Sequence, residues 1–413
     1  MPVLRLIGNR RAWLAVLLVA AAALSFHLRA GRSMPDFQVY RTAATRVVAG
    51  EPLYRASDGH WQFKYLPAFA FVVAPLSLFP APDAARTTQP RGRDYNPWSD
   101  TARVAWFGCS VLLLVALLTL SIRLLPRERG RDVRLDEQRP TRLTPTGAIV
   151  GVTILALGKF YARELELGQT NILLAVVVLL AVRASKAGRE WLSGALFAAA
   201  TVVKPYAIVF LPYLVARRRW RACAALAGVL AAALVMPVLR YGFTGNAALL
   251  AGWLSTVTSS TAPNLAVSDN ISIAGMFAKW LGVGAPARWL ALATALVLVA
   301  ACARTLLVTP AGDCPDYFDA ALLLTLIPLL SPQGWDYVLL LATPAVMLLL
   351  DRLGAFNRAA RWLAVACLLV VGLTLWDVVG RRVYALFMFS SVATLCYLFE
   401  VGLLLRLRQK QVA

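Results

Sequence analysis

Apolar runs of roughly 20 residues recur along the chain and alternate with short polar segments, and this length matches a helix that crosses the core of a bilayer. Each run therefore predicts a transmembrane helix. The predicted helices cover residues 12–28, 103–125, 144–160, 168–183, 222–240, 286–304, 318–330, 337–350, 362–379 and 384–405. The pattern indicates an all-α polytopic membrane protein, a single integral-membrane domain over residues 1–413 with about 11 to 13 spans.

Two further apolar stretches do not fit a simple span. Residues 66–80 are short and contain three prolines, and residues 191–216 are interrupted by Lys204 and Pro205. Proline ends or kinks a helix, and non-helical backbone at membrane depth is tolerated only where it faces protein or a wet cavity. We therefore predict that residues 191–216 form two short helices that meet at a polar hinge, with Lys204 beside a cavity.

Clusters of arginine and lysine predict the orientation of the helices, because short basic loops remain in the cytoplasm. The clusters that we assign to the cytoplasm lie at residues 183–189, 217–221, 352–361 and 406–410. We expect the first helix to be uncleaved, with its N-terminus in the cytoplasm. Residues 30–66 then form the first extracytoplasmic loop and residues 241–285 the largest one. The alternation fails between residues 80 and 143, so the topology of residues 66–143 stays open.

The composition supports a membrane protein and excludes several other classes. Of the 413 residues, 59% are hydrophobic and only 15% are charged, against about 25% charged residues in ordinary soluble domains. A soluble enzyme, a disordered chain and a small disulfide-stapled secreted domain do not have this balance. The richness in alanine and arginine is compatible with a high-GC bacterium.

The net charge of +21 comes from 42 basic and 21 acidic residues. The basic residues lie in short clusters between apolar runs, so we interpret them as topology signals rather than as a nucleic-acid surface. The chain has only two histidines and no CxxC pair, so the sequence predicts no zinc or haem site and no cofactor.

The first extracytoplasmic loop contains an amphipathic stretch directly after Asp36. At helical spacing, one face carries Arg41, Thr45 and Val48 and the other carries Phe37, Tyr40, Ala44 and Val47. Such a helix is expected to lie flat on the membrane surface. Asp36 is placed either to cap this helix or to act as a general base where the first span leaves the membrane, and spacing alone does not decide between the two.

The string Asp36-Phe-x-x-Tyr40, followed by Gly50-x-Pro52-Leu53-Tyr54 and Phe63-x-Tyr65-x-Pro67, resembles the beginning of the polyprenol-phosphate-mannose-dependent mannosyltransferases, glycosyltransferase family 87 of the GT-C superfamily. Later segments agree with the family's motifs in the same order. They are Gly168-Gln169-Thr170-Asn171, Lys204-Pro205 with the basic segment 217–221, Asn270-Ile-Ser272-x-x-Gly275, and Ser331-Pro332-x-x-Trp335-Asp336.

This resemblance implies a GT-C-like helical bundle in the plasma membrane with its active site on the extracytoplasmic side. It implies transfer of a hexose, mannose above all, from a polyprenyl-phosphate donor to a lipid or glycan acceptor, with inversion. The partners would be the donor, the acceptor and membrane lipids, with no nucleic acid and no cofactor; metal dependence is left open. The Asp of the opening motif carries over to Asp36 as the general base.

A departing lipid phosphate requires cations and hydrogen-bond donors around it, for which Lys204, Arg41, Lys64 and Arg240 are candidates. Gln169, Asn171, Asn270 and Ser272 could bind sugar hydroxyls, although each could equally cap a helix. Trp335 could stack on a sugar ring or anchor the chain at the interface. The remaining candidate substrate-binding residues are Tyr40, Tyr65, Gln333, Asp336 and Tyr337. Glu164 and Glu166 are alternative acids or bases.

Three departures from the family pattern leave the sugar, the acceptor and the linkage open. No histidine follows Trp335-Asp336, the Lys-x-x-Pro spacing is contracted to Lys204-Pro205, and residues 86–99 resemble an insertion. A lipid-linked oligosaccharide transporter or flippase, and a polysaccharide polymerase or ligase, are the alternative functions. The chain has few charged residues inside its apolar runs and no internal repeat, which favours an enzyme over a transporter.

Overall fold

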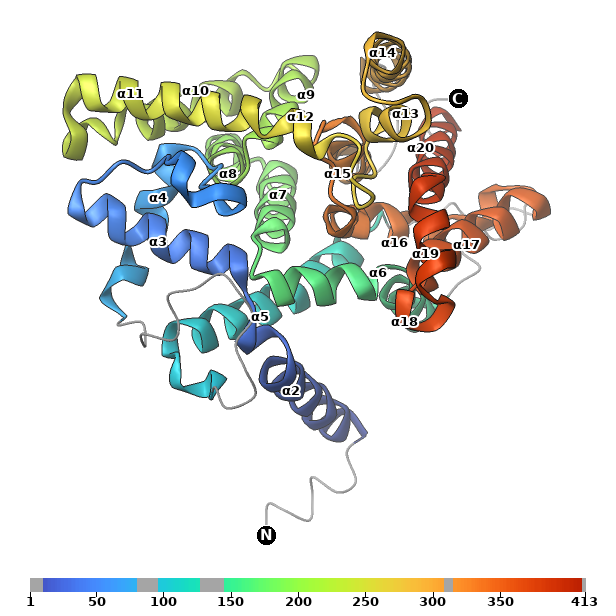
Figure 1. The fold of residues 1–413 in the computed structure, drawn as a ribbon. Coiled ribbons are helices and arrows are strands. Elements are labelled where there is room, and N and C mark those ends of the chain that lie inside the picture. The colour runs from blue at the N-terminus through green and yellow to red at the C-terminus, as the bar shows by residue number, and fades with distance from the viewer. Residues whose placement is uncertain (1–9, 80–95, 127–144, 308–314, 411–413) are drawn as a thin grey trace.

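The computed structural model describes residues 10–79, 96–126, 145–307 and 315–410, and helices form all the regular secondary structure in these ranges (Figure 1). The α-helices discussed below are α2 (Arg10–Leu28), α3 (Pro35–Ala49), α4 (Pro67–Val73), α5 (Thr101–Leu124), α6 (Thr146–Leu167), α7 (Asn171–Lys186), α8 (Glu190–Val203), α9 (Phe210–Ala216), α10 (Trp220–Val235), α11 (Val238–Ser259), α12 (Thr261–Asn264), α13 (Ile273–Leu281), α14 (Ala285–Leu307), α15 (Pro315–Leu330), α16 (Thr343–Asp351), α17 (Arg358–Leu373), α18 (Trp376–Val379), α19 (Arg381–Phe389) and α20 (Val392–Lys410). The predicted all-α class is confirmed. The predicted insertion at 86–99 lies largely outside the described residues.

Fewer helices than predicted are long and apolar enough to cross a membrane. Within the described ranges, α5 and α14 meet both criteria alone, and three bent pairs meet them together: α6 with α7, α10 with α11, and α19 with α20. The pairs bend by 113°, 89° and 51°, so the described residues contain two to five candidate spans rather than the predicted 11 to 13. Many apolar runs instead form short helices inside the protein.

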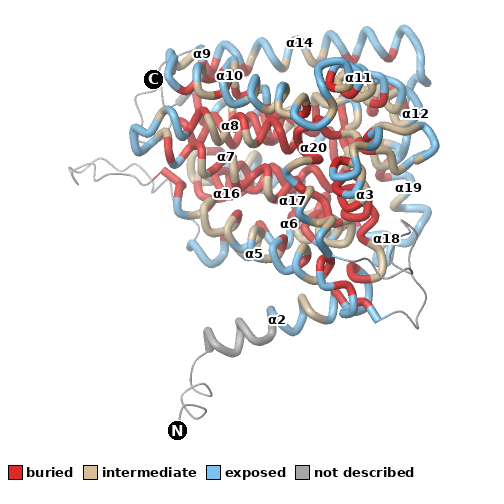
Figure 2. Tube along the Cα trace, turned by 90° about the vertical axis from the view of Figure 1, so that its left-hand side faces the viewer, coloured by how far each residue is buried: buried red, intermediate tan, exposed pale blue. Residues whose placement is uncertain are grey.

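Burial explains this difference. The apolar runs of α7, α15 and α16 supply most of their residues to the largest buried cluster of the described chain, and Figure 2 shows α7 and α16 as largely buried segments inside the molecule. Helices α5 and α14 instead expose large side chains to the surroundings, such as Leu112 at 70% and Val297 at 71%. A helix that is apolar all round can be buried in a large protein or can face lipid, and hydropathy does not distinguish the two.

Three predicted segments have different boundaries. Residues 241–285, predicted as a loop, contain most of α11 together with α12 and α13. The predicted span 384–405 divides into α19 and α20 at Ser391, whose φ of 55° does not continue a helix. The predicted span 362–379 ends early, because α17 stops at Leu373 and is followed by the short helix α18.

The predicted break at Lys204 is confirmed. Helix α8 ends at Val203, Lys204 is extended with φ −145° and ψ 113°, and the 3₁₀ turn η6 (Pro205–Val209) leads into α9. Pro205 has no backbone N–H to continue the helix, and the residue before a proline prefers an extended conformation. The side chain of Lys204 therefore leaves the helical register and points into a cavity.

Helix α3 forms where the amphipathic stretch was predicted, and its burial follows the predicted pattern: Phe37, Tyr40, Ala44 and Val47 are buried, whereas Thr45 and Val48 are exposed. It packs against α4 and the 3₁₀ turn η3 (Ala74–Leu78). Arg41, on the predicted polar face, is only 3% exposed because its guanidinium binds both carboxylate oxygens of Asp100. Arg41 is thus the member of the predicted polar face that the protein buries, and the orientation of α3 relative to the membrane stays a prediction.

Candidate active site

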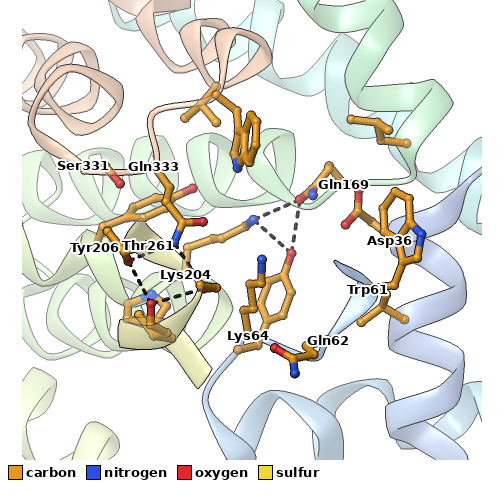
Figure 3. Close-up of a pocket in the computed structure, with 18 of the residues that line it drawn as sticks. Asp36, Trp61, Gln62, Lys64, Gln169, Lys204, Tyr206, Thr261, Ser331 and Gln333 are labelled. Atoms are coloured by element: carbon orange, nitrogen blue, oxygen red, sulfur yellow. Dashed lines mark hydrogen bonds between the residues drawn. The ribbon is translucent and has the colours of Figure 1, made fainter. Parts of the chain in front are cut away.

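A cavity of about 470 Å³ lies where the first turn of α3, residues 60–65, the turn between α6 and α7, the break at Lys204, the end of α11 and residues 331–338 meet (Figure 3). Segments far apart in the sequence thus contribute to one space. Of the predicted site residues, eight line it: Asp36, Lys64, Tyr65, Gln169, Lys204, Gln333, Trp335 and Tyr337.

Asp36 is not the cap of α3. The residue at the N-cap position is Met34, and no side chain caps the helix. Asp36 belongs to the first helical turn, after Pro35, and its half-buried side chain lines the cavity (Figure 3). Of the two roles that the sequence left open, the capping role therefore does not apply.

The surroundings of Asp36 suit a base that works near neutral pH. Burial raises the pKa of Asp36 from 3.8 to about 6, while the Lys204 ammonium, a hydrogen bond with Gln169 and the Lys64 ammonium oppose part of this shift. A carboxylate with such a pKa is ionised at pH 7 and is more basic than an ordinary aspartate.

Gly168 allows the first turn of α3 to approach the turn that carries Gln169. Gly168 ends α6 with a φ of 72°, a left-handed backbone conformation that residues with a side chain rarely adopt. A Cβ at this position would lie 2.8 Å from the Cβ of Phe37. The backbone N–H of Met34 also donates to the Glu166 carbonyl at 3.0 Å. These contacts place Asp36 beside Gln169.

The carbonyl of Gln169 is the centre of a hydrogen-bond network. Lys204 Nζ donates to Gln169 Oε1 at 2.9 Å and to the Tyr65 hydroxyl at 3.0 Å (Figure 3). The Tyr65 hydroxyl donates to the same oxygen at 3.2 Å, and the Tyr40 hydroxyl lies 2.5 Å from the Tyr65 hydroxyl and 3.3 Å from the Gln169 oxygen. An ammonium has three protons, so Lys204 is held in place with one proton left for a ligand. Tyr40 is fully buried and supports this network from behind the cavity.

The second ammonium at the cavity is that of Lys64. Within the part of the chain that the structure describes, neither Lys64 nor Lys204 forms an ion pair with a carboxylate. Burial lowers the pKa of Lys64, which the nearby Asp36 carboxylate partly restores. Two ammonium groups thus face one carboxylate, and the excess positive charge favours an anionic ligand such as a phosphate.

Aromatic residues that were not predicted also line the cavity: Trp61, Tyr206 and Trp253. Trp253 comes from α11, where the sequence predicted a loop, and its indole N–H donates to the Lys64 carbonyl at 3.2 Å. Flat aromatic faces beside polar groups are suited to a sugar ring. Tyr206 follows the break at Lys204 and could have been found from that position, whereas Trp253 gave no signal in the sequence.

Glu164 and Asn171 have structural roles. The carboxylate of Glu164 accepts hydrogen bonds from the backbone N–H groups of Asn171 and Ile172 and from the Asn171 side chain. It thus provides acceptors for the first N–H groups of α7, which have no partner within the helix. Asn171 Oδ1 accepts from the Tyr206 hydroxyl at 2.6 Å. Both side chains are fully buried, and neither lines the cavity.

Asn270 and Ser272 hold the loop that carries Gln333 and Trp335. Asn270 Nδ2 donates to the Pro332 carbonyl at 2.8 Å, and its Oδ1 accepts from the Gly334 N–H at 3.2 Å. Ser272 Oγ caps α13 by accepting from the Gly275 N–H at 2.9 Å. The motif Asn270-x-Ser272-x-x-Gly275 therefore positions the cavity wall and does not line the cavity itself.

Asp336 and Arg41 also lie outside the cavity lining. The carboxylate of Asp336 is 3.8 Å from the guanidinium of Arg163, which in turn binds Asp269 at 2.8 Å. Arg163 does line the cavity and was not predicted. Among the described residues no group of three or more His, Cys, Asp or Glu side chains could hold a metal ion.

The comparison with known protein families gives a match that covers much of the chain. The family model of glycosyltransferase family 87 matches residues 63–332, well over half of the chain. Lys64, Gln169, Lys204 and Asn270 lie inside the matched range, and Asp36 lies before it. No curated protein matches the chain.

Proposed function

The chain belongs to glycosyltransferase family 87 and is thus a membrane glycosyltransferase; from this premise we propose that it transfers a hexose from a polyprenyl-phosphate donor to a hydroxyl group of a lipid or glycan acceptor, with inversion. Mannose is the first candidate for the hexose. We propose that the cavity faces the extracytoplasmic side of the plasma membrane, since the basic clusters predict that the opposite ends of the helices lie in the cytoplasm.

The observation that carries this proposal is the meeting of one carboxylate and two ammonium groups at a single cavity. The cavity is lined by Asp36, Lys64 and Lys204. The two ammonium groups lower the pKa of Asp36, and the Asp36 carboxylate raises the pKa of Lys64. A base and a phosphate-binding pair are the two elements that sugar transfer from a lipid phosphate requires.

In the proposed step, Asp36 takes the proton of the acceptor hydroxyl while that oxygen forms a bond to C1 of the sugar. The bond between C1 and the phosphate oxygen breaks on the opposite face, and its electron pair leaves with the lipid phosphate. Lys204 and Lys64 stabilise the negative charge that develops on the phosphate. Because the leaving group is already a stable anion, the step needs no general acid.

We propose that aromatic and amide groups of the cavity wall hold the sugar. Trp335 and Trp253 offer flat faces for its ring. Gln333 Nε2 donates to Ser260 Oγ at 3.2 Å and to Thr261 Oγ1 at 3.0 Å, which fixes its side chain across the cavity. Its carbonyl oxygen is then directed by these bonds and can accept from a sugar hydroxyl.

The test is Asp36→Asn in purified protein with a labelled polyprenyl-phosphate hexose and a lipid extract as acceptor source. We expect turnover to fall by about 10³-fold or more, because Asn retains the shape of Asp but cannot take a proton. Asp377→Asn removes a carboxylate from an exposed position on α18 and should leave turnover unchanged. Retained turnover in the Asp36 variant would remove this residue from the proposed role.

The same assay decides among the alternative functions. Family membership argues against a transporter or flippase. A polymerase or ligase would use a similar site but would add many units or a preassembled chain, so the mass of the product distinguishes it from the single hexose that we propose.

A further inference from the structure

A smaller cavity of about 120 Å³ lies beside the active-site cavity. We call it the side cavity. One wall comes from α3, and the other comes from the segment after α3, which includes the 3₁₀ turn η2 (Ala56–Trp61). The lining residues are Val39, Thr42, Ala43, Arg46, Asp58, Trp61 and Phe63. The function proposed above does not use this space.

The side cavity lies on the face of α3 that carries the proposed base. At intervals of three or four residues, this helix carries Asp36, Val39, Ala43 and Arg46, and residues with such spacing share one face of a helix. Asp36 and Val39 line the active-site cavity. Val39, Ala43 and Arg46 line the side cavity. The side cavity therefore follows the active-site cavity along α3, beyond Asp36.

Val39 and Trp61 form the wall between the two spaces, because both residues line both cavities. Val39 is 6% exposed, and Trp61 is half-buried against the apolar cluster that includes Val39 and Phe63. Figure 3 shows Trp61 at the same end of the active-site cavity as Asp36. The indole is the larger of the two side chains in this wall, so truncation of Trp61 is expected to join the cavities.

An ion pair holds this wall in place. Arg46 donates from both Nη atoms to the two carboxylate oxygens of Asp58, at 2.5 and 2.7 Å, and also to the Leu53 carbonyl at 3.3 Å. Asp58 and Trp61 belong to the same turn, η2. A bidentate pair between a guanidinium and a carboxylate is short and directional, so it fixes η2 against α3. A wall that is fixed in this way can exclude a group by its size.

The side cavity has the size and the lining for a small polar group that ends in a methyl. A water molecule takes up about 30 Å³ in the liquid, so a volume of 120 Å³ has room for a few non-hydrogen atoms. Val39, Ala43 and Phe63 supply apolar surface. The Thr42 hydroxyl and the Arg46 guanidinium supply hydrogen-bond donors. An acetamido group, with its carbonyl oxygen and its methyl, matches this lining.

The group on C2 of the donor sugar is the one that meets this wall. In the proposed step the acceptor oxygen attacks C1 beside Asp36, and C2 is bonded to C1. A group on C2 therefore lies close to Asp36, at the end of the active-site cavity that Val39 and Trp61 close. A hydroxyl fits in front of the wall, whereas an acetamido group needs the space behind it.

We propose that Trp61 determines which sugar is transferred, because it separates the side cavity from the active site and so restricts the donor to sugars with a hydroxyl at C2. This inference rests on the proposed transferase function. It narrows the substrate class to hexoses without a substituent at C2. Hexoses with a 2-acetamido group are excluded by one side chain, although the protein has space for that group behind it.

The experiment uses full-length protein with a lipid extract as acceptor source and two labelled donors that differ only at C2, polyprenyl-phosphate mannose and polyprenyl-phosphate N-acetylmannosamine. The corresponding pair of glucose donors is measured in parallel. The readout is the ratio of kcat/KM for the acetamido donor to that for the hexose donor. We expect a ratio of about 0.1 or less in the unchanged protein and a rise of about 10- to 100-fold in Trp61→Ala, the range in which pocket size discriminates between substrates.

Three further variants separate the wall from a general loss of shape. Val39→Ala thins the same wall and should raise the ratio by less than Trp61→Ala does. Trp253→Ala removes an indole that lines the active-site cavity and not the side cavity, so it should lower kcat/KM for both donors and leave their ratio unchanged. Thr42→Leu, added to Trp61→Ala, fills the side cavity and should return the ratio toward that of the unchanged protein.

An unchanged ratio in the wall variants would overturn the proposal, and Val39→Ala decides the matter if Trp61→Ala does not fold. Equal use of the two donors by the unchanged protein, or an equal rise of the ratio in Trp253→Ala, would also overturn it. Turnover of a hexose donor with an unchanged ratio contradicts the role of Trp61 alone. Absence of turnover with every donor contradicts the proposed function itself, and this inference with it.

Discussion

Lys204 Nζ donates a hydrogen bond to Gln169 Oε1 at 2.9 Å, and this contact joins the break after α8 to the turn between α6 and α7. The two residues are far apart in the sequence, and each lies where a helix ends. The broken backbone at Pro205 directs the ammonium toward the cavity, and the amide oxygen of Gln169 holds it there. The same amide lies beside Asp36, so one side chain orients the proposed phosphate ligand and contacts the proposed base.

We predict that Lys204→Met weakens donor binding more than acceptor binding. Loss of a charge-assisted hydrogen bond to a phosphate costs about 1.5–3 kcal/mol, so KM for a polyprenyl-phosphate hexose should rise by about 10- to 100-fold. The measurement is initial-rate kinetics with each substrate varied in turn. Lys186→Met, at an exposed position at the end of α7, is the control. Equal effects on the two substrates would argue against a contact with the phosphate.

The ionisation of Asp36 predicts an acidic limb in the pH profile. The proposed base works only when it is ionised, so kcat/KM should fall about tenfold per pH unit below about 6, the pKa to which burial raises Asp36, and should level off above it. Removing the positive charge of Lys64 with Lys64→Met should move this limb to higher pH, because that ammonium favours the carboxylate. A limb that stays in place in this variant would contradict the assignment to Asp36.

Only part of this site was predictable from the sequence. The break at Lys204 could be predicted because Pro205 removes a backbone donor in an apolar run, which is a local effect. The number of spans could not, because α15 and α16 are as apolar as lipid-facing helices although protein surrounds them. Trp253 escaped detection because its place in the cavity depends on the fold of α11 and on no local pattern.

The role of Asn270 shows a further limit of sequence analysis. An asparagine in a segment that resembles a family motif is compatible with sugar binding and with a structural role, and the sequence left both open. The contacts to Pro332 and Gly334 exist only once two distant segments have come together. The motif in the sequence therefore singled out Asn270, and only the tertiary structure shows that its side chain positions the loop with Pro332 and Gly334.

We expect Asp36→Asn to make the protein more stable while it removes turnover. The pKa of Asp36 is higher in the folded protein, at about 6, than its ordinary value of 3.8. The folded state therefore prefers the protonated carboxyl, and the stability that this gives below pH 3.8 is lost as the pH rises through about 6. At pH 8 the ionised, half-buried carboxylate costs about 1–2 kcal/mol after allowance for its partial exposure.

Thermal unfolding in detergent at pH 8 measures this effect. Asp36→Asn should raise the Tm by a few degrees, and Asp377→Asn, at its exposed position, should not change it. Near pH 4.5 the gain should become smaller, because the carboxyl of the unchanged protein is then largely protonated. A Tm that falls at pH 8 would mean that the carboxylate is stabilised by its neighbours more than burial penalises it.

The last prediction concerns Asn270→Asp, which keeps the accepting oxygen of the side-chain amide and removes its donating NH₂ group. The carboxylate can still accept from the Ser272 and Gly334 N–H groups, but it cannot donate to the carbonyls of Pro332, Asn264 and Leu265. Its charge would face these carbonyl oxygens in a buried site. We expect a loss of about 2–4 kcal/mol in stability.

Loss of these hydrogen bonds in Asn270→Asp should also displace the loop that carries Gln333 and Trp335, and so lower activity. Because Gln333 and Trp335 would move while Asp36 would not, kcat/KM should fall and the acidic limb of the pH profile should stay near pH 6. Asn357→Asp is the matched control: the side chain caps α17 from an exposed position by accepting from the Ala360 N–H, and a carboxylate can do the same. A shift of the limb in Asn270→Asp would mean that Asn270 acts on the base itself rather than on the wall that holds the sugar.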